Sequence, residues 1–145
     1  MILIDANLLL YAYDPQSTSH EASRTWLEET LSGPELARFS WLTLWAFLRI
    51  STNPRVFERP LSMKEAAASV ASWLDQPSAG ILEPGERHWE ILEDLTEHGQ
   101  TAGPMVMDAA LAAIAIEHGA TLCTTDRDFS RFAGLTWVNP IAPRN

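Results

Sequence analysis

Short apolar runs alternate along this chain with longer segments of helical character, and this alternation constrains the fold more than any other feature. Each apolar run is short enough to be a buried strand. We expect strands at residues 1–4, 37–40, 81–82, 120–125 and 136–138. Strands that alternate with helices imply parallel pairing and right-handed crossovers. The predicted fold is therefore α/β, a three-layer α/β/α sandwich around a central, mainly parallel sheet.

Capping and stop signals place helices between these runs. Ser62-x-x-Glu65 has the pattern of a capping box, which opens a helix. Gly119 suits the left-handed position after a helix, so it predicts the end of the Ala-rich segment before it. The predicted helices cover residues 19–31, 41–51, 62–74, 84–97, 105–118 and 128–132, and the second is apolar enough to be buried.

Length and composition predict one domain that spans residues 1–145. The chain has 145 residues, of which 46% are hydrophobic, so it can bury a core without disulfides. Its single cysteine, Cys123, excludes a disulfide framework and a zinc site built on cysteine pairs. No apolar run approaches the roughly 18 residues of a membrane span, and the first residues do not resemble a secretory signal. We expect a cytoplasmic protein without a membrane partner.

The charge balance limits how the chain could bind nucleic acid. Ten basic residues stand against 19 acidic ones, a formal net charge of -9. Non-specific binding over the whole surface would need a basic footprint, which this balance excludes. A local basic groove remains compatible with it, because Arg49, Arg55 and Arg59 lie close together in the sequence.

Four aspartates are placed where a parallel sheet would bind a ligand. Asp5 directly follows the first predicted strand, and Asp126 directly follows the strand at 120–125. Asp108 lies near the start of the Ala-rich helix that leads into the latter strand, and Asp128 follows two residues after Asp126. Ligands of open parallel sheets bind beyond the carboxyl ends of the strands. If both strands are central, these carboxylates converge on one crevice.

Crowded carboxylates repel one another unless a cation neutralises them or they take up protons. Hard divalent cations prefer oxygen ligands, and Mg²⁺ takes only a few carboxylates while it keeps several waters. Such a site lowers the pKa of a bound water and stabilises charge on a phosphoryl oxygen. The sequence contains no nucleophile elbow, no P-loop and no His pair with metal spacing. Metal-assisted hydrolysis of a phosphate ester is therefore the predicted reaction class.

Each carboxylate also has an ordinary structural explanation. Asp126 alone fits a helix cap or a turn, and Asp128 also fits a cap. Asp108 alone fits the first turn of a helix, where the macrodipole favours an acid. Asp5 is harder to explain this way, because a carboxylate that ends a buried strand has little evident structural purpose.

At these residues the sequence resembles the PIN domain family, and within it the VapC toxins of bacterial toxin–antitoxin pairs. The similarity runs from Met1 to about Pro140. The segments that carry it are Asp5-Ala6-Asn7, Phe47-Leu48-Arg49, Thr52-Asn53-Pro54-Arg55-Val56-Phe57, Arg59-Pro60-Leu61-Ser62, Asp108-Ala109-Ala110-Leu111-Ala112-Ala113, Glu117-His118-Gly119-Ala120-Thr121 and Thr125-Asp126-Arg127-Asp128-Phe129.

The resemblance implies an endoribonuclease that depends on Mg²⁺ or Mn²⁺, is held inactive by a cognate VapB antitoxin and is a homodimer. By resemblance, Asp5, Asp108 and Asp126 are the metal-binding acids, and Asp128 is an acid near the site. RNA would then be steered by a local set of arginines. Its candidates are Arg49, Arg55, Arg59, Arg127 and Arg131, although a surface ion pair is the favoured explanation for any single one of them.

One departure from the family leaves a second hypothesis open. Most PIN nucleases carry a glutamate on the helix after the second strand, and the position aligned with it here is Ala46. Either the protein works with fewer carboxylates, or Asp128 substitutes, or activity is weakened. The alternative is a catalytically silent PIN-like domain that binds RNA or a protein partner.

Overall fold

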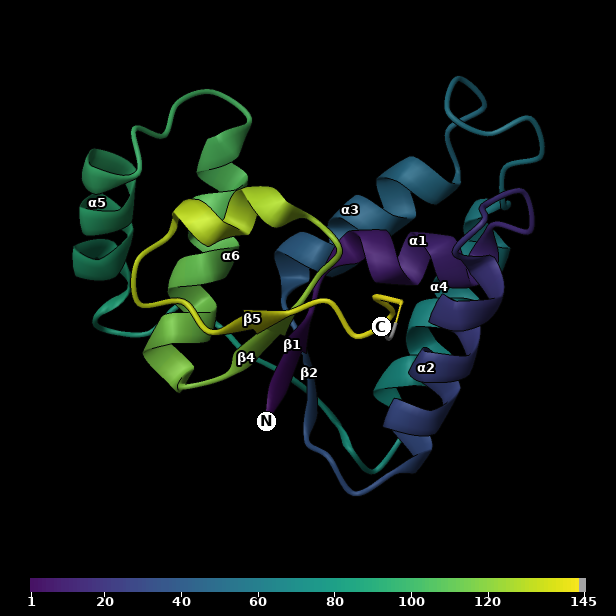
Figure 1. The fold of residues 1–145 in the computed structure, drawn as a ribbon. Coiled ribbons are helices and arrows are strands. Elements are labelled where there is room, and N and C mark those ends of the chain that lie inside the picture. The colour runs from purple at the N-terminus through teal and green to yellow at the C-terminus, as the bar shows by residue number, and fades with distance from the viewer. Residues whose placement is uncertain (144–145) are drawn as a thin grey trace.

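The computed structural model describes residues 1–143 and contains one five-stranded sheet, shown in Figure 1. The strands are β1 (Ile2–Ile4), β2 (Ala37–Phe39), β3 (Ala79–Ile81), β4 (Thr121–Cys123) and β5 (Trp137–Val138). They lie in the order β3-β2-β1-β4-β5, and all four pairings are parallel. The parallel sheet is confirmed, and each observed strand overlaps a predicted one. The strand predicted at 81–82 lies earlier, at Ala79–Ile81, so Leu82 follows it.

Six helices cover the two faces of the sheet. They are α1 (Ala6–Tyr13), α2 (His20–Ser32), α3 (Trp41–Ser51), α4 (Met63–Leu74), α5 (His88–His98) and α6 (Met105–His118). One core cluster joins the sheet to α1, α2, α3 and α4, and a second joins it to α5 and α6. Figure 1 shows these two groups of helices on opposite sides of the strands. This arrangement is the predicted three-layer sandwich.

The centre of the sheet brings the ends of β1 and β4 together. Ile4 lies opposite Cys123 in the register of these two strands, and the Asp5 amide donates to the Cys123 carbonyl at 3.0 Å. Leu3, Ile4 and Leu122 have no exposed surface, as expected for strands covered on both faces. The chain therefore emerges from both central strands at the same edge of the sheet.

The capping signals act as predicted. Ser62 accepts from the Glu65 amide at 3.1 Å, and the Glu65 carboxylate accepts from the Ser62 amide at 3.0 Å, so the capping box is complete. Gly119 follows α6 with φ +67°, a conformation that an L-residue side chain strongly disfavours. The helix at 41–51 also has the predicted bounds.

Three local predictions need correction. The helix predicted from residue 84 begins at His88, because the preceding segment is bound to Glu117 by the amides of Gly85 and Arg87. The helix predicted at 128–132 is a 3₁₀ helix, η1 (Arg127–Arg131). Finally, α3 is not wholly buried, since 60% of Trp45 is exposed.

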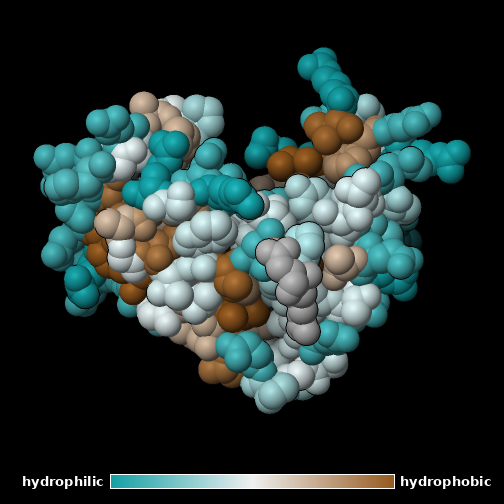
Figure 2. Space-filling view, in the orientation of Figure 1, coloured by the Kyte–Doolittle hydropathy of each residue, from teal (hydrophilic) through white to brown (hydrophobic). Residues whose placement is uncertain are grey.

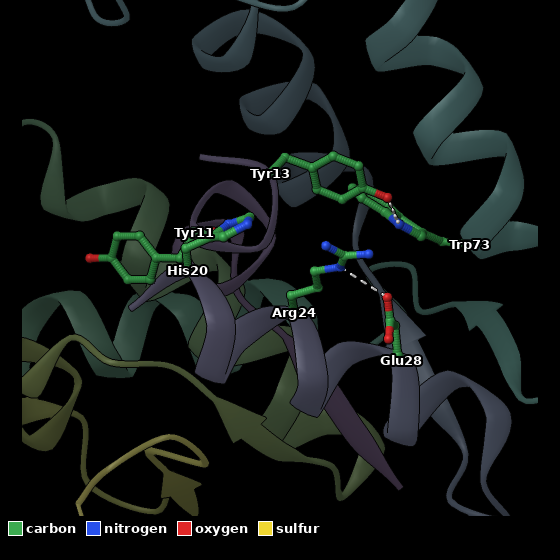
Figure 3. A network of polar contacts seen from close by, with 6 residues as sticks. All are labelled: Tyr11, Tyr13, His20, Arg24, Glu28 and Trp73. Carbon is green, nitrogen blue, oxygen red and sulfur yellow. Dashed lines mark hydrogen bonds and ion pairs between the residues drawn. The ribbon is translucent and has the colours of Figure 1, made fainter. Parts of the chain in front are cut away.

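Polar contacts connect α1, α2 and α4 at one end of their layer, as Figure 3 shows. The Trp73 indole donates to the Tyr13 hydroxyl at 3.0 Å, which links α4 to the end of α1. His20 Nδ1 lies 2.8 Å from the Tyr11 carbonyl, and Arg24 pairs with Glu28 on α2. These contacts lie away from the sheet edge at which β1 and β4 end. None of the helices in residues 1–143 combines the length and the apolar character needed to cross a membrane.

Candidate metal and catalytic site

Asp5 is fixed in place by hydrogen bonds to both of its carboxylate oxygens. Oδ1 accepts from the Ala6 amide at 2.7 Å, and Oδ2 accepts from the Thr124 hydroxyl at 2.7 Å. Burial raises the pKa of Asp5, the two hydrogen bonds oppose that rise, and the charge of Asp126 adds to it. The expectation that this carboxylate has little structural purpose is wrong, because Asp5 is also the N-cap of α1.

Asp108 lines the same cavity as Asp5. It lies in the first turn of α6, and both carboxylates line a cavity of about 580 Å³ between α3 and α6. Desolvation, followed by the charges of Asp5, Asp126 and Asp128, raises the pKa of Asp108 to about 6, while Arg131 acts in the opposite direction. The carboxylate therefore lies in a field of like charge that an added cation would relieve.

Asp126 and Asp128 lie in the turn after β4. The Asp126 side chain caps η1 by accepting from the Asp128 amide at 2.9 Å, so its structural explanation as a cap is correct. Asp126 is half-buried and Asp128 is exposed. Neither of them lines the cavity that Asp5 and Asp108 share, although the charges of both contribute to the raised pKa of Asp108.

Three polar residues that the sequence analysis did not single out hold this turn to the start of α1. The Thr124 hydroxyl accepts from the Asp126 amide at 3.0 Å in addition to its bond to Asp5. The Asn7 amide group donates to the Thr125 hydroxyl at 2.9 Å and lies 3.5 Å from that of Thr124. Their signal in the sequence was position, since each lies within two residues of an aspartate that ends a central strand.

The candidate arginines divide into two groups. Arg49 lines the same cavity as Asp5 and Asp108, and Arg131 acts on Asp108 from η1. Arg127 is exposed at the start of η1 and does not line this cavity. Arg55 and Arg59 follow α3, and Arg59 lines a separate small cavity. Of the five predicted arginines, only Arg49 and Arg131 are therefore associated with the carboxylates.

Ala46 lines the cavity beside Thr43 and Arg49. The glutamate that most PIN nucleases carry at this position would therefore line the cavity, and here alanine takes its place.

The donor set fits a lightly coordinated divalent cation. No three His, Cys, Asp or Glu side chains within residues 1–143 come close enough to hold an ion together. Two carboxylates do share the cavity, and Mg²⁺ is commonly held by one or two carboxylates and several waters. Each Asp5 oxygen keeps a lone pair beyond its hydrogen bond. The pKa of Asp108 is raised first by desolvation and then by the neighbouring carboxylates, and a bound cation would oppose that rise.

Comparison with known proteins places the chain in a family. The PIN domain family matches residues 2–135. The chain is also 42% identical to ribonuclease VapC37 of Mycobacterium tuberculosis over 142 residues, which cover 98% of this chain and 99% of the relative. This chain is a PIN domain protein of the VapC family.

A second relative of this VapC-family protein agrees with that placement, and two solved structures share its fold. Ribonuclease VapC33 of M. tuberculosis is 38% identical over 97% of the chain and 99% of the relative. Among solved structures, VapBC2 of Rickettsia felis bound to a promoter DNA fragment matches with a TM-score of 0.68 and 19% identity, over 95% of this chain and 98% of that chain. VapC20 of M. tuberculosis, described as a toxin that cleaves the sarcin–ricin loop, matches with a TM-score of 0.65 and 17% identity, over 94% of this chain and 99% of that chain.

Proposed function

We propose that this protein is a Mg²⁺-dependent endoribonuclease, the toxin of a type II toxin–antitoxin pair, which hydrolyses RNA phosphodiester bonds. The observation that carries the proposal is the meeting of Asp5 and Asp108, which are 103 positions apart in the sequence, on one cavity. Relatives named ribonucleases over nearly the whole chain support the RNA substrate.

In this proposal Asp5 and Asp108 hold the cation, with Mn²⁺ as an alternative to Mg²⁺. The ion would activate a bound water and stabilise charge on the phosphoryl oxygen. Asp126, assisted by Asp128, would orient the water that attacks the phosphorus. The hydrogen bonds of Asp5 to Ala6 and Thr124 keep its carboxylate oriented, which lowers the cost of ordering it when the ion binds.

Arginine completes the proposed substrate site. Arg49 lines the cavity, where two N–H groups of its guanidinium can donate to two oxygens of a phosphate. Arg131, and Arg127 at the start of η1, would contact the RNA backbone beyond the cavity. This local basic set compensates for the net charge of -9, which otherwise repels RNA.

The partners follow from the same family. Solved neighbours include VapBC2 of R. felis and VapBC-1 of nontypeable Haemophilus influenzae. We therefore propose a VapB-type antitoxin as the inhibitor, a homodimer as the working form, and a cytoplasmic location without a membrane partner.

The test is cleavage of RNA by the purified protein with Mg²⁺, with Mn²⁺ and with a chelator. Cleavage should need the ion and should be lost in Asp5→Asn and Asp108→Asn. Glu93→Gln on α5 is the matched control, because this exposed acid makes no side-chain hydrogen bond or ion pair among residues 1–143. Cleavage that survives chelation, or both Asp substitutions, would refute the assignment.

A catalytically silent domain is the second candidate, and Ala46 on the cavity wall favours it. It predicts normal folding and antitoxin binding without cleavage or growth arrest on expression. Calorimetry with Mn²⁺ separates the two candidates, since a silent domain would bind the ion weakly or not at all.

A further inference from the structure

Two tryptophans form an exposed stacked pair on α3. The rings of Trp41 and Trp45 are 6.5 Å apart with an interplanar angle of 25°, and the residues are 40% and 60% exposed. Arg49 follows at the same spacing of four residues, so all three side chains lie along one face of the helix. A contiguous pair of exposed apolar rings is typical of a surface that binds a partner or a ligand.

This stripe runs into the carboxylate cavity. Trp45 and Arg49 line it together with Asp5 and Asp108, and Met107, which is 54% exposed, lines it from α6. Figure 2 shows this face of the molecule hollowed between the part that carries α5 and α6 and the part that carries α3. A ligand bound at the carboxylates would therefore share its cavity with Trp45.

We propose that Trp45, supported by Trp41, is a stacking platform for an unpaired RNA base next to the scissile phosphodiester, with Arg49 on the adjoining phosphate. The inference rests on RNA being the substrate, as proposed above. It adds a binding element that selects single-stranded segments, because only an unpaired base can lie flat on an indole. Stacking on an aromatic side chain strengthens binding roughly 5- to 150-fold per base.

The neighbouring charges favour a nucleotide over a second protein surface. Arg49 makes no ion pair among residues 1–143, and Asp5 and Asp108 line the same cavity. An apolar protein face pressed onto this stripe would bury these charges without partners, which is costly. A nucleotide offers a π face to Trp45 and an anion to Arg49. Contact with Trp41 also restricts the Trp45 ring before binding, which reduces the entropy lost.

The experiment measures binding by the Asp108→Asn protein in Mg²⁺, a background in which the probe should stay intact. The two probes are a fluorescent single-stranded oligoadenylate and a fluorescent abasic oligomer of the same length, which keeps the ribose-phosphate backbone and lacks the bases. Their binding is measured by fluorescence anisotropy. Adding Trp45→Ala should weaken oligoadenylate binding about 5-fold or more and leave the abasic probe unaffected. Trp45→Phe should restore most of the loss. Trp89→Ala is the matched control, because Trp89 is 69% exposed on α5, outside this cavity.

Three results would overturn the platform. The first is that Trp45→Ala binds oligoadenylate as tightly as the parent protein. The second is that it loses the same affinity for both probes. The third is that light scattering shows a change from dimer to monomer in Trp45→Ala while its oligoadenylate affinity per site is unchanged. The last would show that the rings are buried between two copies of the chain. Failure of the nuclease proposal looks different, since a wild-type protein that binds oligoadenylate through Trp45 but cleaves no RNA would keep the platform.

Discussion

Replacing Asp108 by Asn should stabilise the metal-free protein at neutral to alkaline pH. The pKa of this acid is raised from 3.8 to about 6, so the folded state holds the proton more tightly than the unfolded chain does. The free energy of unfolding therefore falls as pH rises between about 4 and 6, and the full cost is present at about pH 8. Asn cannot ionise and escapes this cost.

The magnitude follows from the pKa shift. Two pKa units correspond to about 3 kcal/mol as an upper limit. Asp108 is only half-buried, so solvent screening reduces the gain to about 1 kcal/mol. The substitution also removes a favourable interaction between the Asp108 charge and the N-terminus of α6, worth about 0.5 kcal/mol. The gain of about 1 kcal/mol includes this loss.

Thermal unfolding in chelator checks the prediction. Asp108→Asn should melt about 3 °C above wild type at about pH 8, and the two should converge at about pH 4. Excess Mg²⁺ should reverse the order, because binding to the folded wild type adds stability that the variant lacks. Glu93→Gln is the control for charge removal. The reasoning fails if Asp108→Asn gains no more than this control, or if its gain does not depend on pH.

Three further changes test the surrounding structure. Thr124→Val removes the hydroxyl that donates to Asp5 and accepts from the Asp126 amide, and it should lower the free energy of unfolding in urea by about 1–3 kcal/mol. The pKa of Asp5 should rise further, which moves the pH–rate profile of RNA cleavage to higher pH. An unshifted profile would contradict this. Ser62→Ala breaks the capping box and should cost about 1 kcal/mol in urea unfolding without changing RNA cleavage. Ala46→Glu adds a carboxylate to the cavity wall and should tighten Mn²⁺ binding in calorimetry; weaker binding would show that a glutamate at this position cannot reach the ion.

The fold was predictable from the sequence because its strands are marked locally. Ile2–Ile4 is apolar on both faces, and so are Leu122 and Cys123 of β4, as expected for central parallel strands. Each strand is followed within three residues by an aspartate. Helix ends at Ser62 and Gly119 were equally readable, because a cap depends on neighbours within a few residues.

The contacts that fix the site were not predictable in the same way. Asn7 and Thr125 meet across 118 positions, and nothing near either residue in the sequence indicates the bond between them. The exposure of Trp45 was mispredicted for a related reason. An apolar helix predicts burial, but whether each of its faces meets a neighbour depends on elements far along the chain.

The sequence by itself determined the parallel α/β architecture and named the aspartates, because periodicity and the residue after a strand are local properties. The tertiary structure alone decided that Asp5 and Asp108 share a cavity, that Arg49 lies with them and Arg127 does not, and that Asp126 is also a helix cap. The physical reason is that hydrogen-bond geometry, desolvation and the field between like charges depend on distances in space.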